Sequence, residues 1–115
     1  DDTACEGFDA DLKVVVPSGR VYFPDATIAC PPRFVASGTI DNPTALFEIL
    51  SASTEERDRQ MKFADYSAIP ELREVVFVES RSKFVEIYRR ESANSDWTFN
   101  PRNAGVVTLP GTGVD

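Results

Sequence analysis

Residues 45 to 50 are the stretch that most restricts the folds open to this sequence. The run Ala-Leu-Phe-Glu-Ile-Leu, read as a strand, carries apolar side chains on both faces, because successive side chains point to opposite sides. Strands that are apolar on both faces lie inside a sheet that is covered on both sides. The stretch therefore predicts a strand in the middle of a sheet, with Glu48 as its one charged residue.

A capping-box pattern marks the start of a helix shortly after this strand. The Ser53 hydroxyl can accept a backbone amide of the first turn, and Glu56, three residues later, can accept the amide of Ser53. Pro70 ends the helical pattern, because proline disfavours helical geometry at the preceding residue and donates no backbone hydrogen bond. We therefore expect one helix from Thr54 to about Ala68.

Two stripes run along the expected helix, because residues four apart share a helical face. The polar stripe consists of Asp58, Lys62 and Tyr66. The small or apolar stripe consists of Met61, Ala64 and Ala68. We expect the second stripe to face the sheet and the first to form the polar side of the helix.

The other extended segments are short and are separated by turn residues. Strands are expected at 12–16, 21–30, 75–78, 84–90, 97–99 and 106–109. Turns at 17–20 and 80–82 make hairpins of the neighbouring strands, and residues 31–43 form a loop. The pattern predicts a single domain over residues 1–115 of the α/β (α+β) class, a mixed sheet with one helix packed on it.

The sequence contains no histidine, and its formal net charge is -7. The missing histidine excludes, within this chain, Ser/His/Asp and Cys/His catalysis and the zinc sites that contain histidine. The acidic balance argues against a non-specific nucleic-acid binder, because affinity for phosphates comes mainly from basic residues. It does not argue against a local metal site, since clustered carboxylates suit a hard divalent cation.

The two cysteines, Cys5 and Cys30, are too few for a disulfide framework. We interpret them as small buried apolar residues. A reducing compartment fits this usage best, so we expect a cytoplasmic protein. No apolar run approaches the roughly 18 residues that a membrane span needs, so we expect no membrane association.

Two acidic residues stand among apolar neighbours, where an unpaired charge is costly. Asp25 lies in the extended run 21–30, and Glu48 lies in the strand at 45–50. If these strands are neighbours, both carboxylates can bind one Mg²⁺, with the carbonyl of Ile49 as a third oxygen ligand. In the alternative interpretation, Asp25 caps a turn after Pro24 and Glu48 points to solvent at a strand end.

Lys62 is the cationic residue that this arrangement can recruit. The helix follows the Glu48 strand after a few residues and folds back over it, which brings the Lys62 ammonium near the metal. There it can orient the attacking water and offset charge in the transition state. In the alternative interpretation, Lys62 and Asp58 form a surface pair at i,i+4 spacing, worth about 0.2 to 0.5 kcal/mol.

These motifs together resemble the Uma-two family of restriction endonucleases, within the PD-(D/E)xK nuclease superfamily. The resemblance runs from about Cys5 to the end of the chain. It is carried by four motifs: Phe23-Pro24-Asp25, the run from Phe47 to Thr54, Arg57-Asp58 with Lys62 and Tyr66, and the run from Pro70 to Val75.

The resemblance implies a restriction-endonuclease-like fold and hydrolysis of DNA phosphodiester bonds with Mg²⁺, or with Mn²⁺ as a substitute. It implies that Asp25 and Glu48 are metal ligands. The superfamily lysine is expected two residues after the glutamate, where this sequence has Leu50, so Lys62 takes the role. Related nucleases cut as dimers, so a homodimer is expected. The family also has an upstream helix and strands that this sequence lacks.

A second function class remains open on the sequence alone. A non-catalytic binding or assembly domain can keep the nuclease fold without cleaving DNA, and both the acidic charge and the shortened start favour it. Plasmid nicking that depends on Asp25 distinguishes the two.

Overall fold

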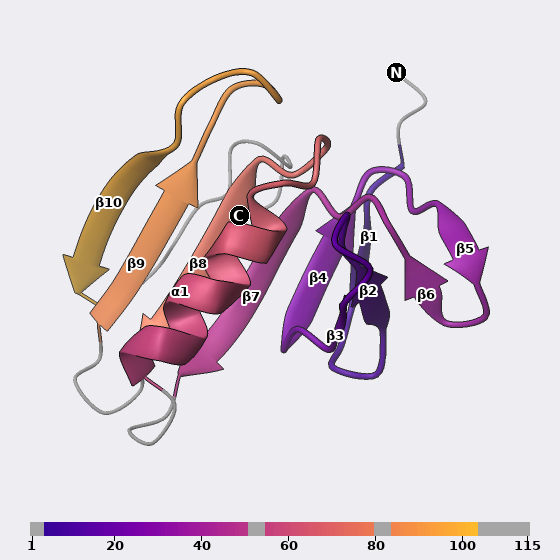
Figure 1. The fold of residues 1–115 in the computed structure, drawn as a ribbon, viewed down its shortest axis with the longest axis horizontal. Helices are drawn as coiled ribbons and strands as arrows, with labels where there is room; N and C mark the ends of the chain where they lie inside the picture. Colours follow the sequence, from indigo (N-terminus) through magenta and orange to yellow (C-terminus); the bar gives the residue numbers. More distant parts are fainter. Residues whose placement is uncertain (1–3, 51–54, 80–83, 104–115) are drawn as a thin grey trace.

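A computed structural model describes residues 4–50, 55–79 and 84–103 of the chain. Its larger sheet has six strands in the order β1-β4-β7-β8-β9-β10, shown in Figure 1. Neighbouring strands run antiparallel except for β7 and β8, which are parallel. The strand bounds are β1 Glu6–Phe8, β4 Ala26–Ala29, β7 Ala45–Leu50, β8 Glu74–Glu79, β9 Phe84–Arg89 and β10 Thr98–Asn103.

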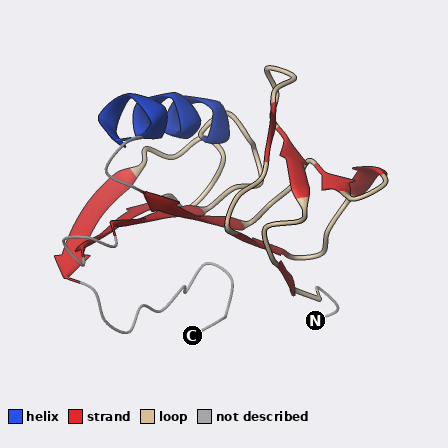
Figure 2. Cartoon of the chain, turned by 90° about the horizontal axis from the view of Figure 1, so that it is seen from below, coloured by secondary structure: helices blue, strands red, loops and turns tan. Residues whose placement is uncertain are grey.

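A smaller sheet of four strands has the order β3-β2-β6-β5. Its strands are β2 Lys13–Val15, β3 Val21–Tyr22, β5 Phe34–Ala36 and β6 Thr39–Ile40. The helix α1 spans Glu55–Tyr66. Figure 2 shows α1 and the smaller sheet on the same side of the larger sheet. The fold is therefore a mixed α+β arrangement with one helix on the larger sheet, as the sequence predicts.

The central position predicted for residues 45–50 is confirmed, because β7 lies between β4 and β8. Its first two residues, Ala45 and Leu46, have no exposed surface. Alternate residues of β7 face opposite sides of the sheet, and Leu46 and Leu50 belong to the main core cluster together with Tyr66 of α1. Glu48 shares their face, so its carboxylate is directed to the helix side.

The helix matches the predicted range at its C-terminal end to within two residues. It ends at Tyr66, after which the amide of Ile69 donates to the Tyr66 carbonyl (2.9 Å) in a tighter turn. Pro70 follows this turn, in agreement with its expected role. The capping box at 53–56 starts outside the described residues.

The prediction of which helical stripe faces the sheet is wrong. Met61 is 47% exposed, whereas Tyr66 is completely buried. The inward face is formed by Phe63 and Tyr66, whose rings bury more apolar area than alanine and methionine would. Lys62 also faces inward, because the sheet supplies an acidic partner for it.

The prediction of a loop over 31–43 is also wrong, because this segment contains β5 and β6. β6 has only two residues and pairs in parallel with β2, a long-range contact that leaves no local pattern in the sequence. Three other differences concern the extent of strands. The run 21–30 is divided into β3 and β4 at Phe23-Pro24-Asp25, β1 is additional, and β10 starts at Thr98 and continues to Asn103. The strand expected at 106–109 lies outside the described residues.

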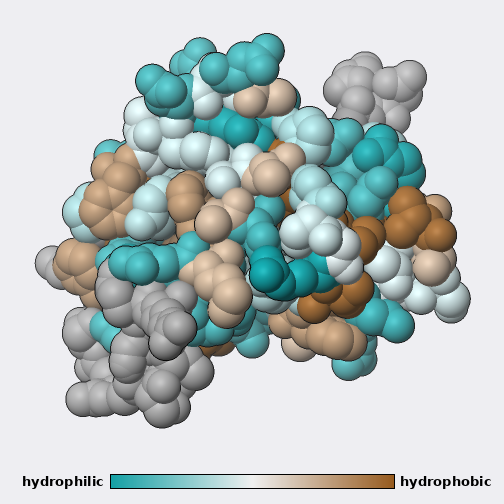
Figure 3. Space-filling model, viewed as in Figure 1, coloured by the Kyte–Doolittle hydropathy of each residue, from teal (hydrophilic) through white to brown (hydrophobic). Residues whose placement is uncertain are grey.

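The main core lies between the larger sheet, the helix and the smaller sheet. Its fully buried members include Val14 of β2, Ile40 of β6 and Phe77 of β8, so all three layers contribute. A second cluster of Val76, Val85 and Ile87 lies in β8 and β9. At the surface, apolar side chains gather over β5, where Phe34 and Val35 are about half exposed, as Figure 3 shows.

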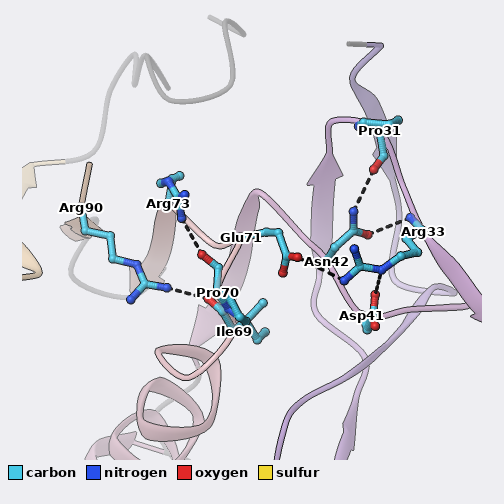
Figure 4. Close-up of polar contacts among 9 residues, drawn as sticks. All are labelled: Pro31, Arg33, Asp41, Asn42, Ile69, Pro70, Glu71, Arg73 and Arg90. Carbon is cyan, nitrogen blue, oxygen red and sulfur yellow. Dashed lines mark hydrogen bonds and ion pairs between the residues drawn. The ribbon is translucent and has the colours of Figure 1, made fainter. Parts of the chain in front are cut away.

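Polar contacts fasten the segment before β7 to the residues that follow α1. The Arg33 guanidinium pairs with Asp41 (2.8 Å) and with Glu71 (3.1 Å), as Figure 4 shows. The Asn42 side chain accepts the amide of Arg33 (2.7 Å) and donates to the carbonyl of Pro31 (2.9 Å). These contacts close the 31–42 segment on itself and tie it to Glu71.

The interpretation of the cysteines as buried apolar residues is wrong, because Cys5 and Cys30 form a disulfide. Glu6 of β1 pairs with Ala29 of β4, so the next residue outward on each strand brings the two cysteines opposite each other. The disulfide therefore anchors the edge strand β1, and it removes the cysteine argument for a reducing compartment. A cytoplasmic location stays a prediction. In the described part of the chain, no helix is long and apolar enough to cross a membrane.

Candidate metal site

Asp25 lies beside Glu48, because β4 and β7 are neighbours as the site prediction requires. The Asp25 amide donates to the carbonyl of Phe47 (3.0 Å), and the Asp25 carboxylate accepts the amide of Ile49 (2.7 Å). Phe47 and Ile49 flank Glu48 in β7. Asp25 thus makes contacts on both sides of Glu48 along the backbone, and its own side chain is exposed. The carboxylate bonds across strands instead of capping a local turn.

Glu48 is only 2% exposed, so the alternative in which it points to solvent is wrong. Two side chains of α1 hold its carboxylate. The Lys62 ammonium lies 3.1 Å from Oε1, and the Tyr66 hydroxyl donates to Oε2. A buried carboxylate needs such partners, because an isolated charge would lose its hydration without compensation.

Burial raises the pKa of Glu48 above its ordinary value of 4.5, and the negative charge of Asp25 acts in the same direction. The hydrogen bond from Tyr66 and the charge of Lys62 oppose this rise. Burial would lower the pKa of Lys62, but pairing with Glu48 and Asp58 outweighs it, so that pKa is raised. Lys62 is therefore fully protonated near neutral pH.

Lys62 also contacts Asp58, with the ammonium 3.4 Å from Oδ2. The i,i+4 pair of the alternative interpretation is thus present, but the same ammonium reaches Glu48 of the sheet as well. Three carboxylates, those of Asp25, Glu48 and Asp58, surround one ammonium. The resulting excess of negative charge favours a divalent cation at this end of β7.

The donor atoms fit a small hard cation. Asp25 and Glu48 supply carboxylate oxygens, which Mg²⁺ prefers, and Mg²⁺ keeps several waters when it binds to one or two carboxylates. The Ile49 amide points to Asp25, and a strand residue directs its N–H and C=O to the same neighbour, so the Ile49 carbonyl is on the β4 side. Within the described ranges no group of three or more His, Cys, Asp or Glu side chains forms a metal site, so waters or substrate must complete the shell.

Tyr66 is a site residue whose role the sequence did not reveal. The regular spacing of Asp58, Lys62 and Tyr66 places all three on one stripe, which was the available signal. A tyrosine next to apolar residues normally indicates core packing. The Glu48 contact becomes visible only when helix and sheet are placed together.

A second ion pair between helix and sheet lies in the same row of the sheet. Glu48 is opposite Phe77 of β8, and Phe77 is opposite Glu86 of β9. Opposite residues of neighbouring strands share a face. Arg59 of α1 pairs with Glu86, as Lys62 pairs with Glu48. The two pairs fix how α1 lies across the sheet and so fix where the Lys62 ammonium is held.

This architecture is that of restriction-endonuclease-like proteins. A crystal structure of a putative nuclease belonging to DUF820 from Anabaena variabilis ATCC 29413 is similar, with a TM-score of 0.67 and 15% sequence identity. The likeness covers 96% of this chain and 63% of that chain. The restriction-endonuclease-like fold implied by the resemblance is thereby confirmed.

The family follows from the sequence comparison. Residues 1–112 match the model of Uma2, described as "Putative restriction endonuclease", and the chain belongs to this family. Two curated relatives are the uncharacterized proteins slr1290 and sll1609 of Synechocystis sp. (strain ATCC 27184 / PCC 6803 / Kazusa). They are 35% identical over 81% of this chain and 31% identical over 77% of it. The matches cover 50% and 52% of those proteins, so the chain spans about half their length.

Proposed function

We propose that this chain carries the metal site of an endonuclease that hydrolyses DNA phosphodiester bonds with Mg²⁺, or with Mn²⁺ in its place. Asp25 and Glu48 are the acidic ligands, and the Ile49 carbonyl is the third protein oxygen. The observation that carries the proposal is the convergence of Asp25 and Lys62 on the buried Glu48. Membership of the Uma2 family supports DNA as the substrate.

Each side chain has a distinct task in this proposal. Mg²⁺, when bound, supplies positive charge that offsets the charge developing on the phosphate. Asp25 and Glu48 hold the cation between the ends of two strands that the sheet keeps in register. Lys62 remains charged, and its ammonium can hold a water by hydrogen bonding and stabilise negative charge on the phosphate.

A non-catalytic binding or assembly domain is the second candidate, and one observation favours it. Both oxygens of Glu48 already have protein partners, Lys62 and Tyr66. A charge network of this kind can serve only to fasten a helix to a sheet. In that case Asp25 is dispensable, because it contacts the backbone of β7 and not the network.

Plasmid nicking by the full-length natural protein tests the choice between the two. With Mg²⁺ or Mn²⁺, we expect conversion of supercoiled DNA to the nicked form by the wild type. Asp25→Asn should reduce the nicking rate by at least about 100-fold, because one of two acidic ligands is lost. Asp96→Asn removes an exposed acid in the loop before β10 and is the matched control, with unchanged nicking expected.

Equal nicking by the wild type and Asp25→Asn would refute the assignment. Nicking that persists with excess chelator would refute the metal requirement. The homodimer expected for this protein is tested separately by sedimentation of the full-length protein with and without DNA.

A further inference from the structure

We propose that Tyr66 is a positioning residue of this site, whose hydroxyl fixes the Glu48 carboxylate in the orientation that receives the cation. The inference rests on the proposed function, since it concerns the same cation. It assigns a task to a buried residue that touches neither the cation nor the substrate.

The geometry around Glu48 shows why a hydroxyl matters here. The terminal torsion of a glutamate side chain is broad, so a carboxylate with one partner can still rotate. Lys62 holds Oε1 from one turn of α1, and Tyr66 holds Oε2 from the next. With both oxygens held, the plane of the carboxylate is fixed before any cation arrives.

Packing alone does not explain a tyrosine at this position. The Tyr66 side chain is completely buried, and a phenylalanine would fill the same space without a hydroxyl that needs a partner. The hydroxyl finds that partner in Glu48, an acid that is itself 2% exposed. Ligand carboxylates are commonly oriented in this way by hydrogen bonds from residues behind them.

A neighbouring tyrosine provides an internal comparison. The rings of Tyr22 and Tyr66 lie 5.2 Å apart, edge to face. The Tyr22 hydroxyl donates to Asp65, which also pairs with Arg20 (2.9 Å). Two adjacent tyrosines thus each serve a different carboxylate, and only the carboxylate served by Tyr66 belongs to the proposed metal site.

Mn²⁺ titration by calorimetry, without DNA, tests the inference on the variants Tyr66→Phe and Tyr22→Phe. Tyr66→Phe should weaken Mn²⁺ affinity by about 10-fold or more, the size typical for loss of a hydrogen bond behind a ligand. Tyr22→Phe should change it less than about twofold, because its hydroxyl serves Asp65. Circular dichroism gives the folded fraction of each variant, and the number of sites is referred to folded protein.

The outcomes separate this inference from the proposed function. Mn²⁺ binding by the wild type that is lost in Asp25→Asn but unchanged in Tyr66→Phe would overturn the role of Tyr66 and leave the metal site intact. No Mn²⁺ binding by the wild type would overturn both. A loss of affinity in Tyr66→Phe equal to that in Tyr22→Phe would show a general effect of the tyrosine pair, and would also overturn the inference.

Discussion

Lys62 of α1 and Glu48 of β7 form a largely buried ion pair, with 3.1 Å between the ammonium and Oε1. The pair joins the only described helix to the centre of the larger sheet. It holds a positive charge next to the two acids that we propose as metal ligands. The same contact therefore contributes to stability and to the proposed chemistry.

Lys62→Met should destabilise the metal-free protein near neutral pH by about 2 kcal/mol, because Glu48 loses its cationic partner. The folded-state pKa of Glu48 is already above its ordinary value of 4.5, and it rises further in the variant. The difference between variant and wild type is therefore present above that pKa and disappears as pH falls through it. Urea denaturation at several pH values measures this.

A double variant provides the control for this prediction. Glu48→Gln in the Lys62→Met background removes the unpaired charge, so the second substitution should restore part of the lost stability. A destabilisation by Lys62→Met that is the same at all pH values would contradict the ion-pair explanation.

Asp65→Asn should cost about 1 kcal/mol of stability at neutral pH, because the carboxylate accepts from Tyr22 and pairs with Arg20. The Tyr22 hydroxyl, first, and Arg20 lower the pKa of Asp65 below its ordinary value of 3.8. This stabilisation is present above pH 3.8 and is lost as pH falls through the lowered pKa. Acid unfolding of the two proteins should converge at the lowest pH. A constant offset would argue against the prediction.

Thr27→Val should stabilise the fold by about 1 kcal/mol, because it removes a buried hydroxyl without a partner. Thr27 has no exposed surface, and its Oγ1 has no hydrogen-bond partner in the part of the chain that the structure describes. Thr39→Val is the matched control, since the Thr39 hydroxyl donates to the Ser37 carbonyl (3.4 Å) and should bring no gain. Thermal denaturation of both variants decides the matter; destabilisation by Thr27→Val would show that the hydroxyl is satisfied.

Reduction of the Cys5–Cys30 disulfide should lower stability by about 3 kcal/mol, because the bond closes a loop of 25 residues in the unfolded chain. The double variant Cys5→Ser, Cys30→Ser should behave like the reduced protein, and reductant should not affect it further. Denaturation with and without reductant measures the difference. Two reactive thiols in the native, air-oxidised protein would show that the bond does not form.

The sequence was sufficient for those parts of the fold that leave a local pattern. The apolar run at 45–50 predicted the central strand, and Pro70 predicted where the helix ends to within a few residues. β6 could not be predicted, because its two residues are a strand only through pairing with β2 far away in the sequence. The pairing of Cys5 with Cys30 likewise depends on the register of β1 against β4.

The candidate site shows the same division. Asp25, Glu48 and Lys62 were identified because charges among apolar residues, or at regular helical spacing, are visible in the sequence. The inward orientation of Lys62 and Tyr66 was not predicted, because hydrophobicity alone favours Met61 and Ala64 on the buried face. The acid in the sheet reverses that preference by giving Lys62 a partner.

The central claim is that Asp25 and Glu48 bind one divalent cation beside Lys62. Anomalous diffraction from crystals of the protein grown with Mn²⁺ tests it most directly. The account predicts one strong peak within about 2.0 to 2.6 Å of a carboxylate oxygen of Asp25 and of Glu48, with Lys62 still beside Glu48. Mn²⁺ bound elsewhere, with these two carboxylates contacting only protein or water, would contradict it.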